Sequence, residues 1–342
     1  MRSLAAHIPY FFITLLCLIV AEVYLYQRNA ALHTSFSASA AAVAAAHAPA
    51  DFTARIPLEK YGLPGELDAE GNFALAFPPE IERVYFEIGL YNNPAFCDLP
   101  AFQPDTFVIA WEANEESWAM HWERCLRLSN GKYVALPFAA ADSPAPLVWN
   151  TNGAQDPCAS LAAGAGKGVK PSGWIEDPVA RAWSRCAAIE ASGKPLFLWD
   201  RPQSHADLEA SIPGMMEACS VCKAHHAPGV NRRFRVPALS LETVLLAIPE
   251  HIAVDLVQID AQGADLAVLE SAKSQMHRIR HVKMEAQDLP LSDPDFLYGG
   301  LLISNASLIS EKMQAYGFPH ATADVNNCAC LEYNLNFYRI LP

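Results

Sequence analysis

The chain has 342 residues, 52% of them hydrophobic, and a formal net charge of -13 at pH 7. This length and hydrophobic content are sufficient for a complete α/β core. The negative charge argues against nucleic acid as a partner, because such binding needs a basic surface and the basic residues gather only at Arg232, Arg233 and Arg235.

Residues 8–26 predict a membrane-spanning helix. They are apolar apart from Thr14 and Glu22, and at helical rise they nearly cross the hydrocarbon layer. We interpret residues 1–28 as a signal anchor that places the remaining chain in the lumen of the Golgi or another secretory compartment. Signal cleavage followed by secretion is the alternative. Residues 29–59 are rich in Ala and Ser, which predicts a stem.

The cysteines fit an oxidising compartment. One lies in the predicted anchor, and the other eight are an even number compatible with disulfides: Cys97, Cys125, Cys158, Cys186, Cys219, Cys222, Cys328 and Cys330. Cys219 and Cys222 with His225 and His226 resemble half of a zinc site, which Cys328 and Cys330 could complete. We favour disulfides and predict no metal. Asn305-Ala306-Ser307 is a glycosylation sequon, as expected of a luminal glycoprotein.

Residues 60–342 predict one α/β domain with a doubly wound, mostly parallel, Rossmann-like sheet. A long segment at about 161–235 interrupts the alternation of strands and helices, and we interpret it as an insertion. The predicted strands are residues 84–88, 106–111, 133–139, 254–259 and 281–285, with an edge strand at 334–340. The predicted helices include 115–128 and 240–247.

Two of the predicted strands end on acidic residues typical of nucleotide sites. Glu87 and Gly89 close the first strand, where a glycine lets the backbone approach a ligand. Glu112 closes the next strand, at the position of an acidic residue that binds ribose hydroxyls. The alternatives are a plain strand-to-loop turn at Glu87 and, at Glu112, a solvated glutamate that starts the helix near Glu115.

The same turn distinguishes between two cofactors. NAD needs an open, glycine-rich helix start for its pyrophosphate, whereas Tyr91 and Asn93 stand at the positions of the second and third glycines. S-adenosylmethionine has no phosphates, and Asn93 could hydrogen-bond its amino-acid end. The sequence therefore favours S-adenosylmethionine.

Residues 255–272 predict a strand, a sharp turn and a helix. The strand ends at Asp260, Gly263 follows, and apolar residues then recur at helical spacing. Ligands bind beyond the carboxyl ends of parallel strands, so Asp260 is expected at the rim of a site. We expect Gln262 and Gly263 to shape the turn.

The order and spacing of these segments resemble FkbM-type class I methyltransferases over roughly residues 80–340. The segments are VYFEIG (84–89), FVIAWEAN (107–114), VALPFAAAD (134–142), DPCASL (156–161), RVPALSLETVL (235–245), DLVQIDAQGADLAVLESA (255–272), HVKMEAQD (281–288) and EYNLNFYR (332–339). The resemblance implies methyl transfer from S-adenosylmethionine, commonly to a hydroxyl. It also implies a cofactor turn at Glu87, Gly89 and Asn93, a ribose contact at Glu112, and Asp142 near the adenine.

Methyl transfer to a hydroxyl needs a base for the hydroxyl proton. Asp260 is our candidate general base, and Glu285, which ends the next strand, could orient the acceptor. The alternative for Asp260 is a cap on the helix that follows it.

The sequence thus predicts a luminal O-methyltransferase whose acceptor is a sugar hydroxyl on a glycan or a secreted small molecule. We expect the insertion, with Trp174, Trp183 and Trp199, to recognise that acceptor. One alternative is a catalytically silent scaffold with the same fold. Another is a glycosyltransferase, whose acidic metal-binding pair would be Asp293 and Asp295.

Overall fold

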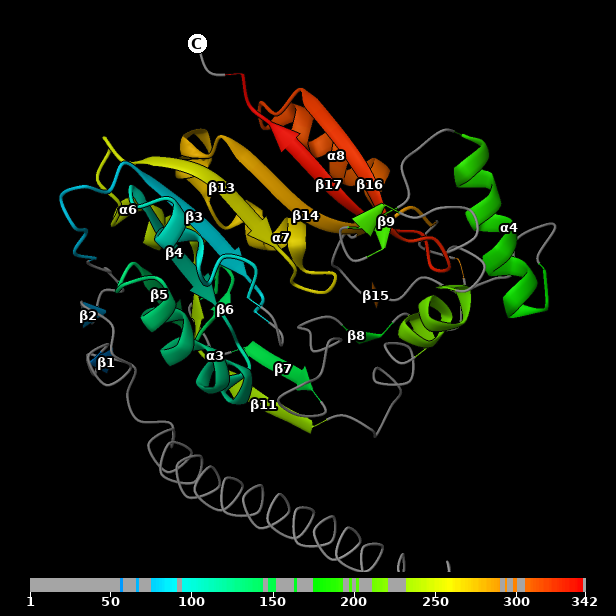
Figure 1. The fold of residues 1–342 in the computed structure, drawn as a ribbon, viewed down its shortest axis with the longest axis horizontal. Helices are drawn as coiled ribbons and strands as arrows, with labels where there is room; N and C mark the ends of the chain where they lie inside the picture. Colours follow the sequence, from blue (N-terminus) through cyan, green and yellow to red (C-terminus); the bar gives the residue numbers. More distant parts are fainter. Residues whose placement is uncertain are drawn as a thin grey trace, which may run out of the picture. The chain divides into compact units, whose positions relative to one another are not determined.

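Figure 1 shows the protein as a computed structural model. The structure describes residues 56–57, 66–67, 75–90, 94–143, 147–151, 163–164, 175–192, 197–198, 201–202, 211–220, 232–289, 293, 298–299 and 305–340. They belong to one compact unit, Ile56–Pro342. The predicted anchor and Asn93 lie outside the described residues. Within the described part of the chain, no helix is long and apolar enough to cross a membrane.

The centre of the unit is a seven-stranded sheet in the order β16-β17-β14-β13-β3-β4-β5. Its strands are β3 (Arg83–Ile88), β4 (Thr106–Trp111), β5 (Tyr133–Leu136), β13 (Ala253–Ile259), β14 (His281–Gln287), β16 (His320–Asn327) and β17 (Glu332–Tyr338). The first five of these pair in parallel, and β17 runs antiparallel to both β14 and β16. This mostly parallel, Rossmann-like sheet confirms the predicted α/β fold.

The sheet grows in opposite directions from its middle. From β3 the chain adds β4 and β5 on one side, then returns to add β13 and β14 on the other (Figure 1). The order therefore reverses between β3 and β13, and Ile88 at the end of β3 is paired with both Trp111 and Ile259. In open α/β sheets, this reversal at the carboxyl ends is where ligands bind.

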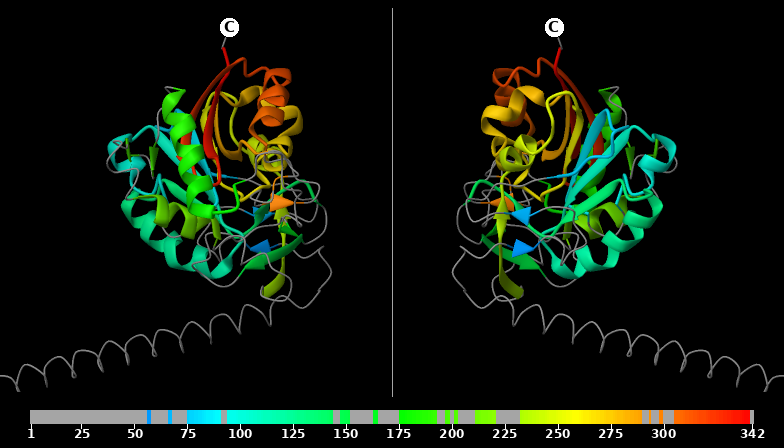
Figure 2. Two further views of the ribbon diagram at one scale, coloured as in Figure 1. Left: turned by 90° about the vertical axis from the view of Figure 1, so that its right-hand side faces the viewer. Right: turned by 90° about the vertical axis from the view of Figure 1, so that its left-hand side faces the viewer.

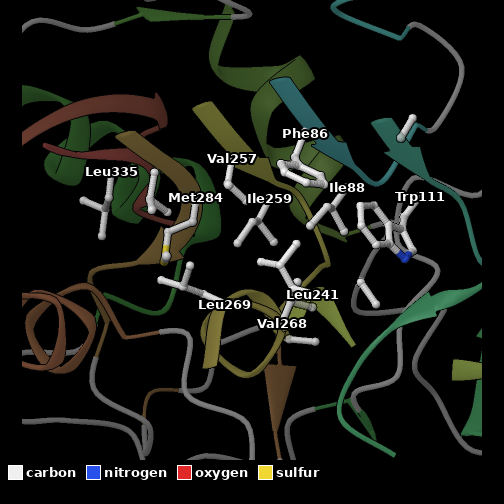
Figure 3. Close-up of a cluster of buried hydrophobic side chains, with 14 of the residues drawn as sticks. Phe86, Ile88, Trp111, Leu241, Val257, Ile259, Val268, Leu269, Met284 and Leu335 are labelled. Carbon is white, nitrogen blue, oxygen red and sulfur yellow. The ribbon is translucent and has the colours of Figure 1, made fainter. Parts of the chain in front are cut away.

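Helices cover both faces of the sheet. Figure 2 shows α7 (Asp265–Glu270) and α8 (Ala306–Ala315), in yellow to orange, on one side, and the teal helix α3 (Glu115–Leu128) on the other. α6 (Leu241–Leu246) and the 3-10 helix η2 (Lys273–Arg278) pack together beside α7. Figure 3 shows the buried core between these elements and the sheet, where Leu241, Val268 and Leu269 meet Phe86, Val257, Ile259 and Met284.

The predicted elements match the structure closely except at the end of the chain. β4 and α3 have the predicted bounds, whereas the third strand stops at Leu136. The prediction of an edge strand at 334–340 is wrong, because β17 lies inside the sheet and β16 forms the edge. β16 has the polar sequence HATADVNN, so its hydrophobic pattern is too weak to predict a strand.

The segment at 161–235 carries small elements of its own. α4 (Pro178–Ala191) begins at the N-cap Asp177, whose side chain accepts a hydrogen bond from the Val179 amide. Residues of this segment and of other parts of the chain also form short paired strands: β7 (Leu147–Thr151) with β11 (Arg232–Val236), β8 (Ala163–Gly164) with β15 (Tyr298–Gly299), β9 (Phe197–Leu198) with β10 (Arg201–Pro202), and β6 (Ala139–Ala140) with β12 (Ala238–Leu239). Another short pair, β1 (Ile56–Pro57) with β2 (Glu66–Leu67), precedes the sheet.

Among the described residues, three disulfides join distant parts of the chain. Cys97–Cys125 links the segment before α2 (Leu99–Phe102) to α3. Cys186–Cys328 and Cys219–Cys330 connect α4 and the helical residues 211–220 to the turn between β16 and β17. These bonds confirm the prediction of disulfides and indicate an oxidising secretory or extracellular environment.

The disulfides also bear on the zinc alternative. A cysteine in a disulfide has no thiolate to give a metal, so Cys219, Cys328 and Cys330 are not zinc ligands in this structure. The part of the chain that the structure describes contains no group of side chains arranged to hold a metal ion. Cys158, Cys222, His225 and His226 lie outside that part.

Candidate functional site

The ends of β3 and β13 approach each other closely at Gly89. The Asp260 amide donates to the Ile88 carbonyl at 2.8 Å, and the Gly89 amide donates to the Trp111 carbonyl at 2.9 Å. Gly89 has φ +90°, and a Cβ at this position would lie 2.1 Å from the Asp260 carbonyl oxygen. A side chain cannot fit there, so the glycine brings the two strand ends together.

We expect Gly89→Ala to lower the free energy of unfolding by about 3 kcal/mol, from left-handed strain plus the forced separation of the strand ends. Gly131→Ala is the matched control, because Gly131 has φ +82° but open space around its Cβ position. That variant should lose only about 1–2 kcal/mol. Urea unfolding of both proteins measures the difference, and equal losses would contradict the close approach.

Glu87 is buried at the end of β3, with its side chain directed to the following loop. Its carboxylate accepts hydrogen bonds from the amides of Ala95 and Phe96. Burial raises the pKa of Glu87 to about 7, and these two amide hydrogen bonds act in the opposite direction. In this structure Glu87 thus anchors the chain just after Asn93, the last residue of the predicted cofactor turn.

Glu112 links the ends of β3 and β4. Its Oε2 accepts from the Leu90 amide at 3.1 Å, and its Oε1 accepts from the Asn114 amide at 2.7 Å. Asn114 is the N-cap of α3 and accepts a hydrogen bond from the Glu116 amide. Glu112 therefore supports the residue that caps α3, but it is buried and is not the solvated glutamate of the alternative interpretation. A carboxylate oxygen has two lone pairs, so this support does not preclude a ribose contact.

Two buried polar atoms, one in β4 and one in β5, lack partners within the described part of the chain. Among the described residues, the Trp111 indole nitrogen and the Tyr133 hydroxyl have no hydrogen-bond partner, and each residue is 1% exposed. Figure 3 shows the Trp111 indole nitrogen pointing away from Phe86 and Ile88. Burial first, and then the charges of Glu87 and Glu112, raise the pKa of Tyr133. Buried polar groups normally have partners, so the Tyr133 hydroxyl leaves hydrogen-bonding capacity near Glu87 and Glu112.

Asp142 lies in an exposed ion pair. Its Oδ1 is 2.8 Å from the Lys273 Nζ, and Lys273 also lies 4.0 Å from Glu242. The described contacts do not join Asp142 to Glu87 or Glu112. Its predicted place near the adenine stays a prediction.

The structure brings Asp260 and Glu285 together through Gln262. The Gln262 side-chain amide donates to Asp260 Oδ1 at 2.5 Å and to Glu285 Oε2 at 3.1 Å. α7 begins at Asp265 with Ala264 as its N-cap and no side-chain cap, so Asp260 does not cap this helix. The cap interpretation of Asp260 is therefore wrong.

Sequence reasoning missed two other carboxyl groups at this edge. Asp265 is completely buried below the turn and accepts from the amides of Gly263, Ala261 and Glu285 at 3.1, 3.4 and 3.3 Å. Glu332 begins β17, opposite Gln287 at the end of β14. The sequence signal for Asp265 was its place beside Gly263, whereas only strand pairing brings Glu332 to the site.

The charge of Asp260 affects the pKa values of both of these carboxyl groups. Burial, then the charge of Asp260, raises the pKa of Asp265 to about 8 and that of Glu332 to about 7. The pKa of Asp260 is also raised, mainly by desolvation, against the Gln262 hydrogen bond and the charge of Lys283. Asp260 is itself exposed to solvent, which limits this desolvation and leaves the carboxyl accessible. An accessible carboxyl with a raised pKa suits proton transfer near neutral pH.

The remaining predicted residues are distributed as follows. Asp293, from the glycosyltransferase alternative, is buried and lies 3.6 Å from Arg185 of α4. Its partner Asp295 lies outside the described residues, as do Trp174 and Trp199. Trp183 is half-buried and packs against the core, as expected of a structural tryptophan.

Comparisons of the chain with models of protein families, with curated proteins and with solved structures find no match. The methyltransferase resemblance therefore rests on the sequence segments alone.

Proposed function

We propose that the protein is an S-adenosylmethionine-dependent methyltransferase that acts on a hydroxyl group. The observation that carries the proposal is the meeting of three strand ends at the reversal of the sheet. Glu112 follows β4, Gly89 follows β3, and Asp260 follows β13, on adjacent strands. An acidic residue for a ribose and a candidate base are thus on either side of a glycine turn.

The residues on the β3 and β4 side fit a nucleoside. The Glu112 carboxylate is an acceptor of the kind that ribose hydroxyls need, and the Tyr133 hydroxyl, near Glu87 and Glu112, has no partner among the described residues. When bound, S-adenosylmethionine would supply a methyl group on a positively charged sulfur. The fit concerns only the nucleoside end, because residues 91–93 lie outside the described part.

The residues on the β13 and β14 side fit a hydroxylated acceptor. Asp260 is exposed and can accept the hydroxyl proton, while Glu285 can hold the acceptor by a second hydrogen bond. Placing the acceptor oxygen in line with the methyl group supplies much of the rate, so rigid support of both carboxylates matters.

The test of cofactor binding is calorimetric titration of the protein with S-adenosylmethionine. We expect binding in the micromolar range, weakened about tenfold or more by Glu112→Gln, which keeps the shape of the side chain but accepts poorly at its amide nitrogen. Glu242→Gln is the control, since Glu242 is a glutamate bonded to Ser274 on η2. No binding at millimolar cofactor would rule out the enzyme.

A catalytically silent scaffold is the second candidate, and one observation favours it. The carboxylates of Glu87 and Glu112 both bind backbone amides of the chain itself. A fold that has lost its cofactor would keep such internal contacts. In that case Glu112→Gln would lower stability without changing any heat of titration.

We also propose that the protein is a single-pass membrane protein with this domain in the lumen of the Golgi or another secretory compartment. The disulfides support the compartment, and the sequence of residues 8–26 supports the anchor. A glycan or secreted molecule is then the available acceptor. Protease protection of the domain in intact microsomes, and its loss after detergent, tests this topology.

A further inference from the structure

We infer that Gln262 is a positioning residue that holds Asp260 and Glu285 as one hydrogen-bonded pair. The inference rests on the proposed function, because the pair would act by removing the proton of the acceptor hydroxyl. The sequence suggested that Gln262 only shapes the turn. Its contacts in the structure indicate more.

The geometry of Gln262 is specific. One side-chain NH₂ group has two hydrogens, and here it has two acceptors, Asp260 Oδ1 at 2.5 Å and Glu285 Oε2 at 3.1 Å. Since ionised carboxylates only accept, the nitrogen and not the oxygen of the amide faces both of them. The amide thus places a donor between two groups that would otherwise repel each other.

The backbone of Gln262 indicates that the side chain matters. Gln262 has φ +49°, in the left-handed region, where glycine costs least. A residue needed only for the turn would be replaced by glycine with a gain in stability. Strained backbone of this kind clusters at functional sites, and here it coincides with the two-acceptor contact.

The charged groups near Asp260 determine how its pKa would respond to removal of the Gln262 side-chain amide. The described charged groups near Asp260 are Asp265 on α7, Lys283 and Glu285 on β14, and Glu332 on β17. Three of these four are acidic, so the Gln262 donor and Lys283 are what favour the ionised form of Asp260. Removing the donor should raise the pKa of Asp260 further.

The experiment uses the full chain and two variants, Gln262→Gly and Gln262→Leu. Gly relieves the backbone strain and Leu keeps the bulk, and both remove the amide. A carboxyl whose pKa is raised by folding stabilises the fold below about pH 4, and that stability is lost as pH rises through the folded pKa. As the pH rises from 5 to 8, the thermal midpoint of the natural protein should fall. We expect the midpoints of both variants to fall about 2–3 °C further over the same range.

Asn130→Gly is the matched control, because Asn130 has φ +54° and is exposed on a turn. Its midpoint should move equally at both pH values. If the midpoint of Gln262→Gly also differs from that of the natural protein by the same amount at every pH, Gln262 is only a turn residue and the inference is wrong.

Activity gives a separate test. With tritiated S-adenosylmethionine and glycans from cells that lack the protein, the acidic limb of the pH profile of kcat should move up by about one pH unit in Gln262→Leu. An unmoved limb would overturn the inference. If the natural protein transfers no methyl group while the pH-dependent midpoints hold, the proposed function fails and the hydrogen-bonded pair stands.

Discussion

Asp260→Asn is expected to lower methyl transfer at least 100-fold while leaving the affinity for S-adenosylmethionine within a few-fold. An asparagine keeps the shape of the side chain and can still accept from the Gln262 amide at Asp260's position, but it cannot take the hydroxyl proton. General base catalysis contributes about 10²–10⁴-fold, which sets the magnitude. Tritium transfer to glycans measures turnover, and calorimetry measures affinity.

The same substitution should stabilise the protein. The charge of Asp260 raises the pKa values of Asp265 and Glu332, which are about 8 and 7. Raised carboxyl pKa values mean that stability falls as pH rises from about 4 to 8, and removing the charge reduces that fall. The thermal midpoint of Asp260→Asn at pH 8 should therefore rise by about 2–4 °C.

Loss of activity with a gain of stability is the signature of a functional site. Asp255→Asn is the control, since Asp255 is on the same strand but pairs with Arg280 and Arg83. It should retain turnover and lose a little stability. Turnover near the natural value in Asp260→Asn would remove Asp260 from the mechanism.

Removing the two disulfides of the β16–β17 turn is expected to destabilise the fold by about 5 kcal/mol or more. Cys186–Cys328 and Cys219–Cys330 span sequence separations of 142 and 111 residues. Cross-links over loops of this length restrict the unfolded chain most strongly, at about 4–5 kcal/mol each, and overlapping loops add less than their sum. Urea unfolding of the Cys328→Ser, Cys330→Ser protein measures the loss.

The turn also holds α4 and residues 211–220 by weaker bonds. Arg185 donates to the Ala329 carbonyl, and Asn327 donates to the Met215 carbonyl. Without the disulfides, the segment is held only by such bonds and by its packing on the core, so limited proteolysis should cut the double variant first within residues 161–235. Cys97→Ser with Cys125→Ser is the control, because that bond spans only 28 residues and lies elsewhere. Equal proteolysis patterns in the two variants would contradict the role of the turn.

Much of the sheet could be predicted because its signals are local. The strands at 84–88, 106–111 and 254–259 are short apolar runs, and α3 has an Asn114 cap and an apolar face. β16 could not be predicted, since its sequence is polar and only pairing with β17 makes it a strand. Local pattern gives no information about such long-range pairing.

The candidate site, like the sheet, could be predicted from the sequence only in part. The sequence by itself placed Glu87, Glu112 and Asp260 at or just past the ends of the central strands, because a strand's end follows from its hydrophobic run. The prediction that Glu285 ends its strand is wrong, because β14 continues to Gln287. Only the tertiary structure decided which groups these side chains contact. It turned Glu87 and Glu112 toward backbone amides, excluded the cap role of Asp260, and joined Asp260 to Glu285 through Gln262.

The cysteines show the same limit. Their even number and the predicted compartment indicated disulfides, but sequence could not pair them. The structure joins Cys328 and Cys330, two residues apart, to two different helices, and brings Glu332 beside Asp260 through the same turn. Pairing and electrostatic neighbours depend on distances between residues far apart in the chain, and folding alone sets those distances.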